Sequence, residues 1–92
     1  MIKSIKHKGL RLFFETGKSS GIQSAHVRKL RFQLTALASA VVIDDMDLPG
    51  YRLHRLKGDR KDCWSIRVDK NRRLTFEFFD SGVYFLNYED YH

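Results

Sequence analysis

The sequence predicts an α+β domain in which N-terminal helices pack on one face of a small antiparallel β-sheet. Apolar residues recur at helical spacing in the first half of the chain, and in the second half they alternate with polar residues as in strands. Between the halves lies a polar loop that is closed by the turn pair Pro49-Gly50. Helices that precede a run of short alternating strands are typical of α+β domains.

Two helices are expected before this loop. The first covers residues 7–16 and stops at Gly17, a residue type that often follows the last turn of a helix. The second follows Ser24, which is a favourable N-cap residue. Its apolar positions recur at steps of three and four and form one stripe, Val27, Leu30, Leu34, Leu37 and Val41. A small domain needs this surface for its core, so we expect the stripe to be buried, with His26 and Gln33 off it.

Three strands are expected after the loop, over residues 64–68, 73–78 and 83–88. The connections between them are short and polar, which favours an antiparallel meander with one apolar face. Residues 51–56 and 2–5 are candidates for further short strands.

The alternation also predicts which side chains point away from the core. If Leu74 and Phe76 face the helices, Arg73 and Thr75 face the other way. Arg67 does the same on the preceding strand. The uncovered face of the sheet is therefore expected to be cationic.

Length and composition limit the class of protein. With 92 residues, 42% of them hydrophobic, and a single Pro, the sequence fits one folded domain over residues 1–92. No apolar run approaches the roughly 18 residues that span a membrane, and the N-terminus does not look like a secretory signal. Cys63 is the single cysteine, which excludes an intrachain disulfide and zinc-ligand spacing. We therefore expect a protein of the reducing cytoplasm, without a metal or cofactor.

Positive charge dominates the sequence and is concentrated in one segment. The net charge is +6, and residues 52–73 carry nine Lys or Arg against three Asp, a local balance of +6. Such a segment favours an anionic partner, either a nucleic acid or an acidic protein. The alternative is a solvated surface that only keeps a small protein soluble.

Three proton-transfer side chains accompany this basic segment. His54 lies within it, and the chain ends in Tyr91-His92 directly behind the last predicted strand. Cleavage of RNA without a metal requires that the 2′-hydroxyl lose a proton, that the 5′-oxygen gain one and that the phosphorane charge be stabilised. Those tasks suit His and Arg. Each residue also has a plainer interpretation: His54 as a surface residue, the last two residues as a frayed terminus, and Arg73 as a partner of Glu77 on the same strand face.

Three motifs stand at distinctive spacings in the second half of the chain: Lys57-Gly58, Trp64-Ser65-Ile66 and the terminal Asp90-Tyr91-His92. Together with the runs 53–60 and 71–76, they resemble the HigB toxins, which belong to the RelE/ParE superfamily of bacterial toxin–antitoxin systems. The opening residues and the overall length match that family as well, so the resemblance covers essentially the whole chain.

The resemblance implies a RelE-like fold, an activity and a set of partners. The implied activity is that of a ribosome-dependent endoribonuclease, which cleaves mRNA in the A site of the 30S subunit and blocks translation. The implied inhibitor is a HigA-type helix-turn-helix antitoxin. The complex of toxin and antitoxin would repress its own operon, so that operator DNA is a partner only through the antitoxin. No membrane partner is implied.

Site residues also follow from the resemblance. The positions that match the catalytic set of the family are His54, Lys57, Arg73, Tyr91 and His92. A supporting position is matched by Asp90, which is expected to orient one of the histidines. Further contacts with RNA are expected from Arg60, Arg67 and Arg72. The last of these departs from the family pattern, because the position before the matching Arg73 is commonly Trp.

The implied roles divide the set into proton handlers and phosphate binders. Either His54 or His92 would transfer protons. Lys57 and Arg73 would hold the phosphate and its developing charge, and Tyr91 would orient the substrate or stack on a base.

Two other functions compete with this interpretation. One is a non-catalytic module, either a ParE-like relative that acts on a protein target such as gyrase or a toxin that has lost activity. It would share the fold and the antitoxin, but it has no need for the grouped side chains of His54, Tyr91 and His92. The other is a simple DNA-binding domain, for which no recognition helix with base-reading side chains stands out.

Overall fold

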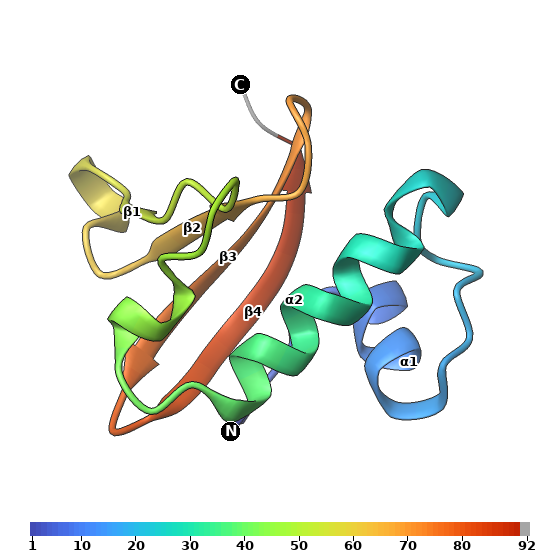
Figure 1. Ribbon diagram of the computed structural model, residues 1–92, viewed down its shortest axis with the longest axis horizontal. Helices are drawn as coiled ribbons and strands as arrows, with labels where there is room; N and C mark the ends of the chain where they lie inside the picture. The colour runs from blue at the N-terminus through green and yellow to red at the C-terminus, as the bar shows by residue number, and fades with distance from the viewer. Residues whose placement is uncertain (91–92) are drawn as a thin grey trace.

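A four-stranded antiparallel sheet fixes the position of the polar residues in the second half of the chain (Figure 1). The computed structural model describes residues 1–90. The strands are β1 (His54–Arg55), β2 (Trp64–Arg67), β3 (Arg72–Phe79) and β4 (Gly82–Asp90), and each pairs with the next. The predicted meander is therefore confirmed, and β1 adds a fourth strand from within the candidate segment 51–56.

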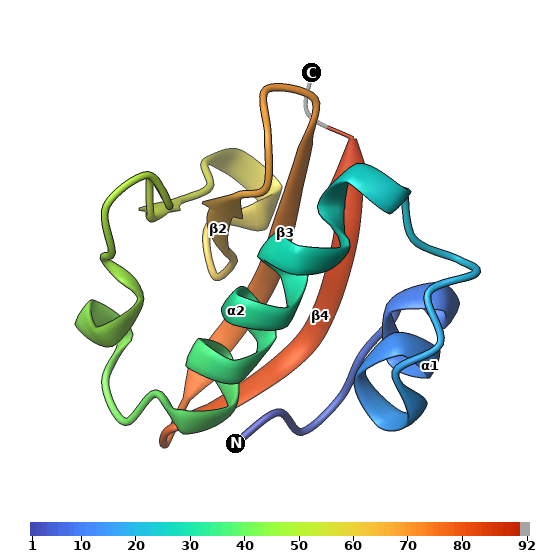
Figure 2. The same ribbon diagram turned by 45° about the vertical axis from the view of Figure 1, so that its right-hand side comes forward.

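Two helices complete the α+β class that the sequence predicts. They are α1 (Lys8–Thr16) and α2 (Val27–Ser39), and the chain also forms the short 3-10 turns η1 (Ser24–His26), η2 (Ile43–Met46) and η3 (Gly58–Arg60). The longer helix, α2, packs against one face of the sheet, and α1 lies beyond the β4 edge (Figures 1 and 2). Among residues 1–90, no helix is long and apolar enough to cross a membrane.

The N-terminal segment covers the free edge of β4. Ile2 bridges Val83 and Ile5 bridges Leu86, both in parallel orientation, and the N–H of Lys3 donates to the Val83 carbonyl oxygen over 2.7 Å. The candidate strand over residues 2–5 is thus reduced to two isolated bridges. These bridges still satisfy some of the backbone hydrogen-bonding groups along the edge of β4, which could otherwise pair with a strand of another molecule.

The core lies between the helices and the inner face of the sheet. Its buried apolar side chains are Leu10, Phe13, Ile22, Leu30, Leu34, Leu37, Ala40, Met46, Ile66, Val68, Leu74, Phe76, Val83, Leu86 and Tyr88. The predicted helical stripe is confirmed at its three leucines. It is wrong at Val41, which is 64% exposed, because α2 ends at Ser39 and the helical spacing does not continue beyond it.

Two polar residues of the α2 region are buried, although the helical pattern predicts that they lie off the core. Gln33 is fully buried, and its Nε2 donates to the Arg67 carbonyl oxygen over 2.8 Å. His26 is 4% exposed. Its Nε2 lies 2.6 Å from Oδ2 of Asp69, and its Nδ1 bonds the Tyr88 hydroxyl. These partners allow the His26 ring and the Gln33 amide nitrogen to be buried, whereas Oε1 of Gln33 is buried without a hydrogen-bond partner among the described residues.

The helix ends agree with the prediction at one place and differ at another. α1 ends at Thr16 and is capped by Gly17, whose left-handed φ of 80° suits glycine and whose N–H donates to the Phe13 carbonyl oxygen over 2.8 Å. Ser24, in contrast, is not the N-cap of α2. It begins η1, and α2 starts at Val27 without a side-chain cap.

Asp69 shapes the connection between β2 and β3. Its Oδ1 accepts the backbone N–H groups of Asn71 and Arg72, each over 2.8 Å, while its Oδ2 faces His26. The bond with His26 is the largest cause that lowers the pKa of Asp69 to about 2, and the two backbone N–H groups add to it. The carboxylate is therefore ionised at neutral pH and holds the residues that lead into β3.

We expect Leu37→Ala to lower the free energy of unfolding by about 2–5 kcal/mol, because it leaves a cavity at a fully buried position. Val41→Ala truncates the exposed member of the same predicted stripe and is expected to change that free energy by less than about 0.5 kcal/mol. Urea unfolding followed by far-UV circular dichroism gives both values. Equal losses would contradict the observed end of α2.

A second prediction concerns pH. Because the folded-state pKa of Asp69 lies below its ordinary value of 3.8, the ionised carboxylate stabilises the fold above that value. The contribution is lost as the pH falls through about 2. Asp69→Asn keeps an oxygen for the two backbone amides but removes the charge, so it should destabilise the protein at neutral pH and much less near pH 2.

The measurement is urea unfolding of wild type and variant across this pH range. The exposed Asp62 offers a matched control, because Asp62→Asn removes the same charge away from His26. A destabilisation by Asp69→Asn that did not change with pH would contradict the role given to the ionised carboxylate of Asp69.

Candidate active site

Two rows of polar side chains cross the face of the sheet that lies opposite α2. Cross-strand partners in an antiparallel sheet share a face, so the register defines these rows. One row runs His54, Ser65, Thr75 and Asn87 from β1 to β4, and beside it runs Arg67, Arg73 and Glu89. The prediction that Arg67 and Arg73 point away from the core is therefore confirmed.

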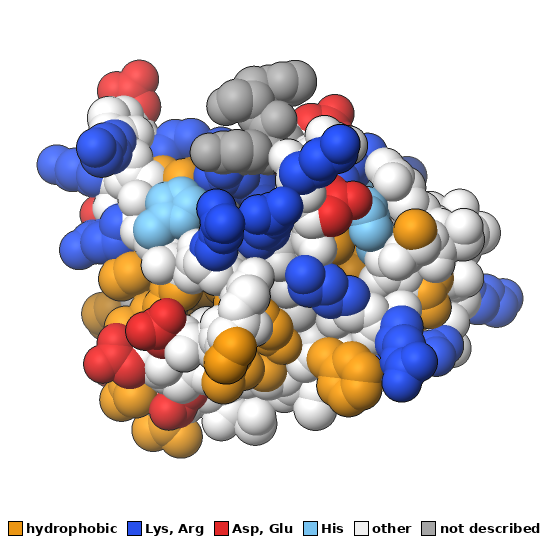
Figure 3. Space-filling model, turned by 45° about the horizontal axis from the view of Figure 1, so that its top comes forward, with side chains coloured by type: hydrophobic (Ala, Val, Ile, Leu, Met, Phe, Trp, Pro, Cys, Tyr) orange, Lys and Arg blue, Asp and Glu red, His pale blue; other side chains and the backbone are white. Residues whose placement is uncertain are grey.

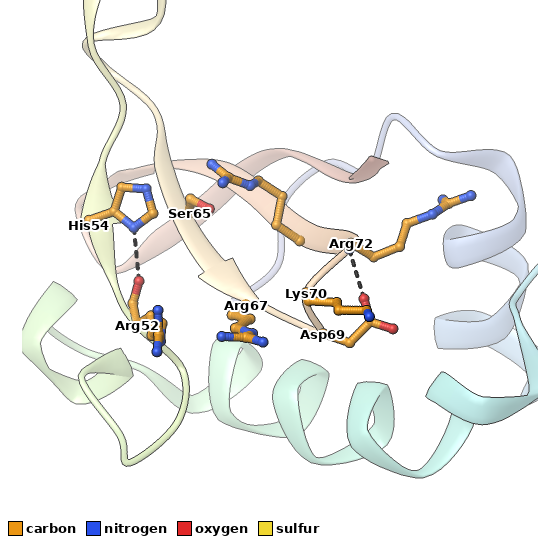
Figure 4. Close-up of a pocket in the computed structure, with 8 residues that line it drawn as sticks. Arg52, His54, Ser65, Arg67, Asp69, Lys70 and Arg72 are labelled. Carbon is orange, nitrogen blue, oxygen red and sulfur yellow. Dashed lines mark hydrogen bonds between the residues drawn. The ribbon is translucent and has the colours of Figure 1, made fainter. Parts of the chain in front are cut away.

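A cavity of about 290 Å³ opens on this face, between β1 and the connection from β2 to β3 (Figure 4). It is lined by Arg52, His54, Ser65, Arg67, Asp69, Lys70, Arg72 and Arg73. Five of these eight residues are Lys or Arg and one is Asp, so the cavity favours an anion. Figure 3 shows Lys and Arg side chains gathered beside histidine on the upper part of the molecule.

His54 lies on β1, at one end of the cavity (Figure 4). Its Nδ1 is 2.9 Å from the Arg52 carbonyl oxygen, and because a carbonyl oxygen only accepts, Nδ1 carries the proton. In the neutral ring the lone pair is then on Nε2, which is the arrangement needed to accept a proton from a hydroxyl. Arg52 itself has a left-handed φ of 50°, a strained backbone conformation that is frequent at functional sites.

Arg67 and Arg73 form the cationic centre of the cavity. They are direct cross-strand partners, and both are half-buried. Like charges opposite each other destabilise a sheet, so this pairing is expected where an anion binds. Glu89 is the partner of Arg73 on its other side, so two guanidinium groups and one carboxylate leave this row with a net charge of +1.

Glu89 is a member of the site that the sequence did not reveal. Its carboxylate accepts two bonds from Arg60, over 3.1 Å to Oε1 and 2.6 Å to Oε2, and a third from the Thr75 hydroxyl. Burial acts to raise the pKa of Glu89, but the bonds from Arg60 and Thr75 outweigh it and lower the pKa overall. Arg60, which was predicted to contact RNA, is therefore paired with an ionised carboxylate in this structure.

Arg72 and Asp90 form a second ion pair at the edge of the site. Arg72 Nε lies 2.7 Å from Oδ1 of Asp90, and its guanidinium carbon lies 4.5 Å from the centre of the Tyr88 ring. The resemblance implied that Asp90 orients a histidine, whereas the ion pair that the structure gives it is with Arg72. Arg72, which departs from the pattern that the resemblance implies, thus stacks on an aromatic ring.

The structure brings together four of the predicted residues, since His54, Arg67, Arg72 and Arg73 line one cavity. Lys57 is exposed and directly precedes η3, outside that lining. Tyr91 and His92 lie outside the described residues.

Sequence reasoning missed several members of the lining. They are Arg52, Ser65, Asp69 and Lys70. Ser65 could have been found from its alternation with Ile66, and Asp69 from its place in the short connection after β2. Among residues 1–90, no group of three or more His, Cys, Asp or Glu side chains is arranged to hold a metal ion.

Comparison with known proteins finds toxins that match over the whole chain. A family model described as a RelE-like toxin of the type II toxin–antitoxin system HigB matches residues 3–92. The chain is 49% identical over 92 residues to the endoribonuclease HigB of Proteus vulgaris, and the match covers 100% of both chains. It is 37% identical over 98 residues to toxin HigB-1 of Vibrio cholerae, covering 100% of this chain and 98% of that protein.

The fold is also found among solved structures. A chain of the YoeB-YefM complex from Staphylococcus aureus matches with a TM-score of 0.59 and 14% identity, covering 100% of this chain and 95% of that chain. At this identity the likeness supports the fold alone. The family model and the two sequence relatives agree over the whole length, and the chain therefore belongs to the HigB-like family of RelE-like toxins of type II toxin–antitoxin systems.

Proposed function

We propose that the protein is a ribosome-dependent endoribonuclease that cleaves mRNA in the A site and thereby inhibits translation. The observation that supports this most is the cationic cavity, in which His54 presents a lone pair on the same face as Arg67 and Arg73. The relative from Proteus vulgaris carries the name of an endoribonuclease, and its 49% identity over the full length supports the same activity here.

In the proposed reaction, Nε2 of His54 takes the proton of a 2′-hydroxyl that attacks the adjacent phosphate. A bond forms between the 2′-oxygen and phosphorus, and the bond from phosphorus to the 5′-oxygen breaks. Arg67 and Arg73 bind the phosphate oxygens and stabilise the negative charge that develops there. A positioned proton acceptor contributes about 10²–10⁴-fold to such a reaction.

The other roles rest on the match to the family. We assign the proton that the 5′-oxygen gains to His92, and the orientation of the substrate to Tyr91. Lys57 is proposed to bind the phosphate and stabilise its developing charge. Asp90 supports the site through its ion pair with Arg72. Arg60 is a further candidate for RNA contact, provided that a phosphate displaces Glu89 from it.

The partners follow from the same proposal. The substrate is mRNA on the ribosome, and the regulator is a HigA-type helix-turn-helix antitoxin that neutralises the toxin. Operator DNA is bound through the antitoxin complex. A small helix-turn-helix gene directly beside the gene for this chain would support this assignment.

Arg73→Ala is expected to lower kcat for cleavage of ribosome-bound mRNA by about 10²–10³-fold, because it removes a guanidinium that stabilises the developing phosphate charge. Arg55→Ala is the matched control: it removes the same charge from the opposite face of the sheet, where Arg55 lies over the Trp64 ring. The control should cleave at the wild-type rate. The measurement is the rate of fragment appearance from a defined mRNA on translating ribosomes.

Removal of Tyr91-His92 tests the other half of the site in the same assay. If this truncation and Arg73→Ala both cleave as fast as the wild type, the site assignment is wrong. If the wild type arrests growth while ribosome-bound mRNA stays intact, a ParE-like inhibitor with a protein target such as gyrase replaces the proposed function.

A further inference from the structure

We infer that His26 is a positioning residue of the RNA site: the hydrogen-bonded chain Tyr88–His26–Asp69 holds the connection between β2 and β3, and through it sets the direction of Arg73. This inference rests on the proposed function. It assigns a role to His26 and Tyr88, which are buried behind the cavity and do not line it.

The chain joins three side chains from distant parts of the sequence. Tyr88 lies on β4, His26 ends η1, and Asp69 follows β2. Because a carboxylate only accepts, His26 Nε2 donates to Asp69 over their 2.6 Å contact. In a neutral imidazole Nδ1 then accepts from the Tyr88 hydroxyl, so one direction of donation runs from Tyr88 to Asp69 and satisfies every member.

Asp69 connects these hydrogen bonds to the backbone at the start of β3. Its Oδ2 is held by His26, so its Oδ1 is presented at a fixed place, where it accepts the N–H groups of Asn71 and Arg72. Arg73 is the next residue along the chain. The placement of its guanidinium in the cavity therefore depends on a connection that is anchored from behind by His26.

Tyr88, on β4, also restrains the start of β3 through Arg72. Its ring lies under the Arg72 guanidinium, with 4.5 Å between the guanidinium carbon and the ring centre, and Asp90 binds Arg72 from the side. Successive residues of a strand point to opposite sides. Holding Arg72 over Tyr88 therefore directs Arg73 toward the row that it shares with Arg67.

The three hydrogen-bonded side chains Tyr88, His26 and Asp69 are all polar, which indicates that they orient the backbone as well as stabilise the fold. Buried polar groups add little stability over apolar groups of the same shape, and they cost free energy wherever one is left unpaired. Hydrogen bonds, however, fix angles that apolar contacts leave variable. A fully paired polar chain beside the apolar core, next to the cavity that is proposed to hold a phosphate, fits that use.

Three variants and one control test the inference. Tyr88→Phe keeps the ring that supports Arg72 but removes the hydroxyl. His26→Leu removes both bonds, and His26→Gln is the conservative variant, because its amide can still donate to Asp69. Tyr84→Phe removes a hydroxyl from the same strand at a position that does not line the cavity, so it should behave as wild type.

Two measurements are made at a temperature where circular dichroism shows every variant fully folded. The first is kcat and KM for cleavage of ribosome-bound mRNA. His26→Leu and Tyr88→Phe should lose about 10- to 100-fold in kcat with little change in KM, because a misplaced Arg73 lowers the rate without preventing docking. His26→Gln should regain much of the loss. The second is hydrogen exchange at the amides of Asn71 and Arg72, which should speed up in the same order.

Each result then bears on the inference. Unchanged hydrogen exchange at Asn71 and Arg72 in His26→Leu would overturn the inference. Faster exchange with an undiminished kcat would also overturn it, because the rigidity of the connection between β2 and β3 would then have no effect on cleavage. Failure of the wild type to cleave mRNA would overturn the proposed function instead. In that case the exchange data alone uphold or overturn the link between His26 and the connection.

Discussion

The antiparallel pairing of β2 with β3 is the interaction on which the rest of the structure depends. Its register sets Ile66 opposite Leu74 in the core and Arg67 opposite Arg73 on the other face. A slip of one residue would turn the arginines into the core and the apolar side chains into the cavity. The free energy of apolar burial therefore fixes where the cations of the site stand, although no apolar side chain takes part in the proposed chemistry.

Three carboxylates around the cavity each bind one particular donor, and these pairs hold the margins of the cationic surface in place. Asp69, Glu89 and Asp90 pair with His26, Arg60 and Arg72, respectively. Each pair joins segments that are far apart in the sequence or in neighbouring strands. The lining still carries five Lys or Arg against one Asp, so an anionic substrate is attracted to a surface whose edges are already held in place.

Much of this arrangement could be predicted from local patterns. Alternation in β2 and β3 placed Arg67 and Arg73 correctly, because side-chain direction in a strand depends only on the period of two. The burial of His26 could not be predicted in this way, since it depends on partners 43 and 62 residues away. Glu89 was missed for the same reason. Val41 was misassigned because the end of α2 at Ser39 carries no proline or glycine to mark it.

The identity of the fragment ends tests the central claim most directly, namely that this cavity promotes attack by a 2′-hydroxyl on the adjacent phosphate. A defined mRNA would be cleaved on translating ribosomes by the wild-type protein, and both ends at the cut would be analysed. The proposed reaction breaks the bond from phosphorus to the 5′-oxygen. It predicts a 5′-hydroxyl on the downstream fragment and a phosphate retained on the upstream one. A 5′-phosphate on the downstream fragment would contradict it, because the other phosphorus–oxygen bond would then have been broken.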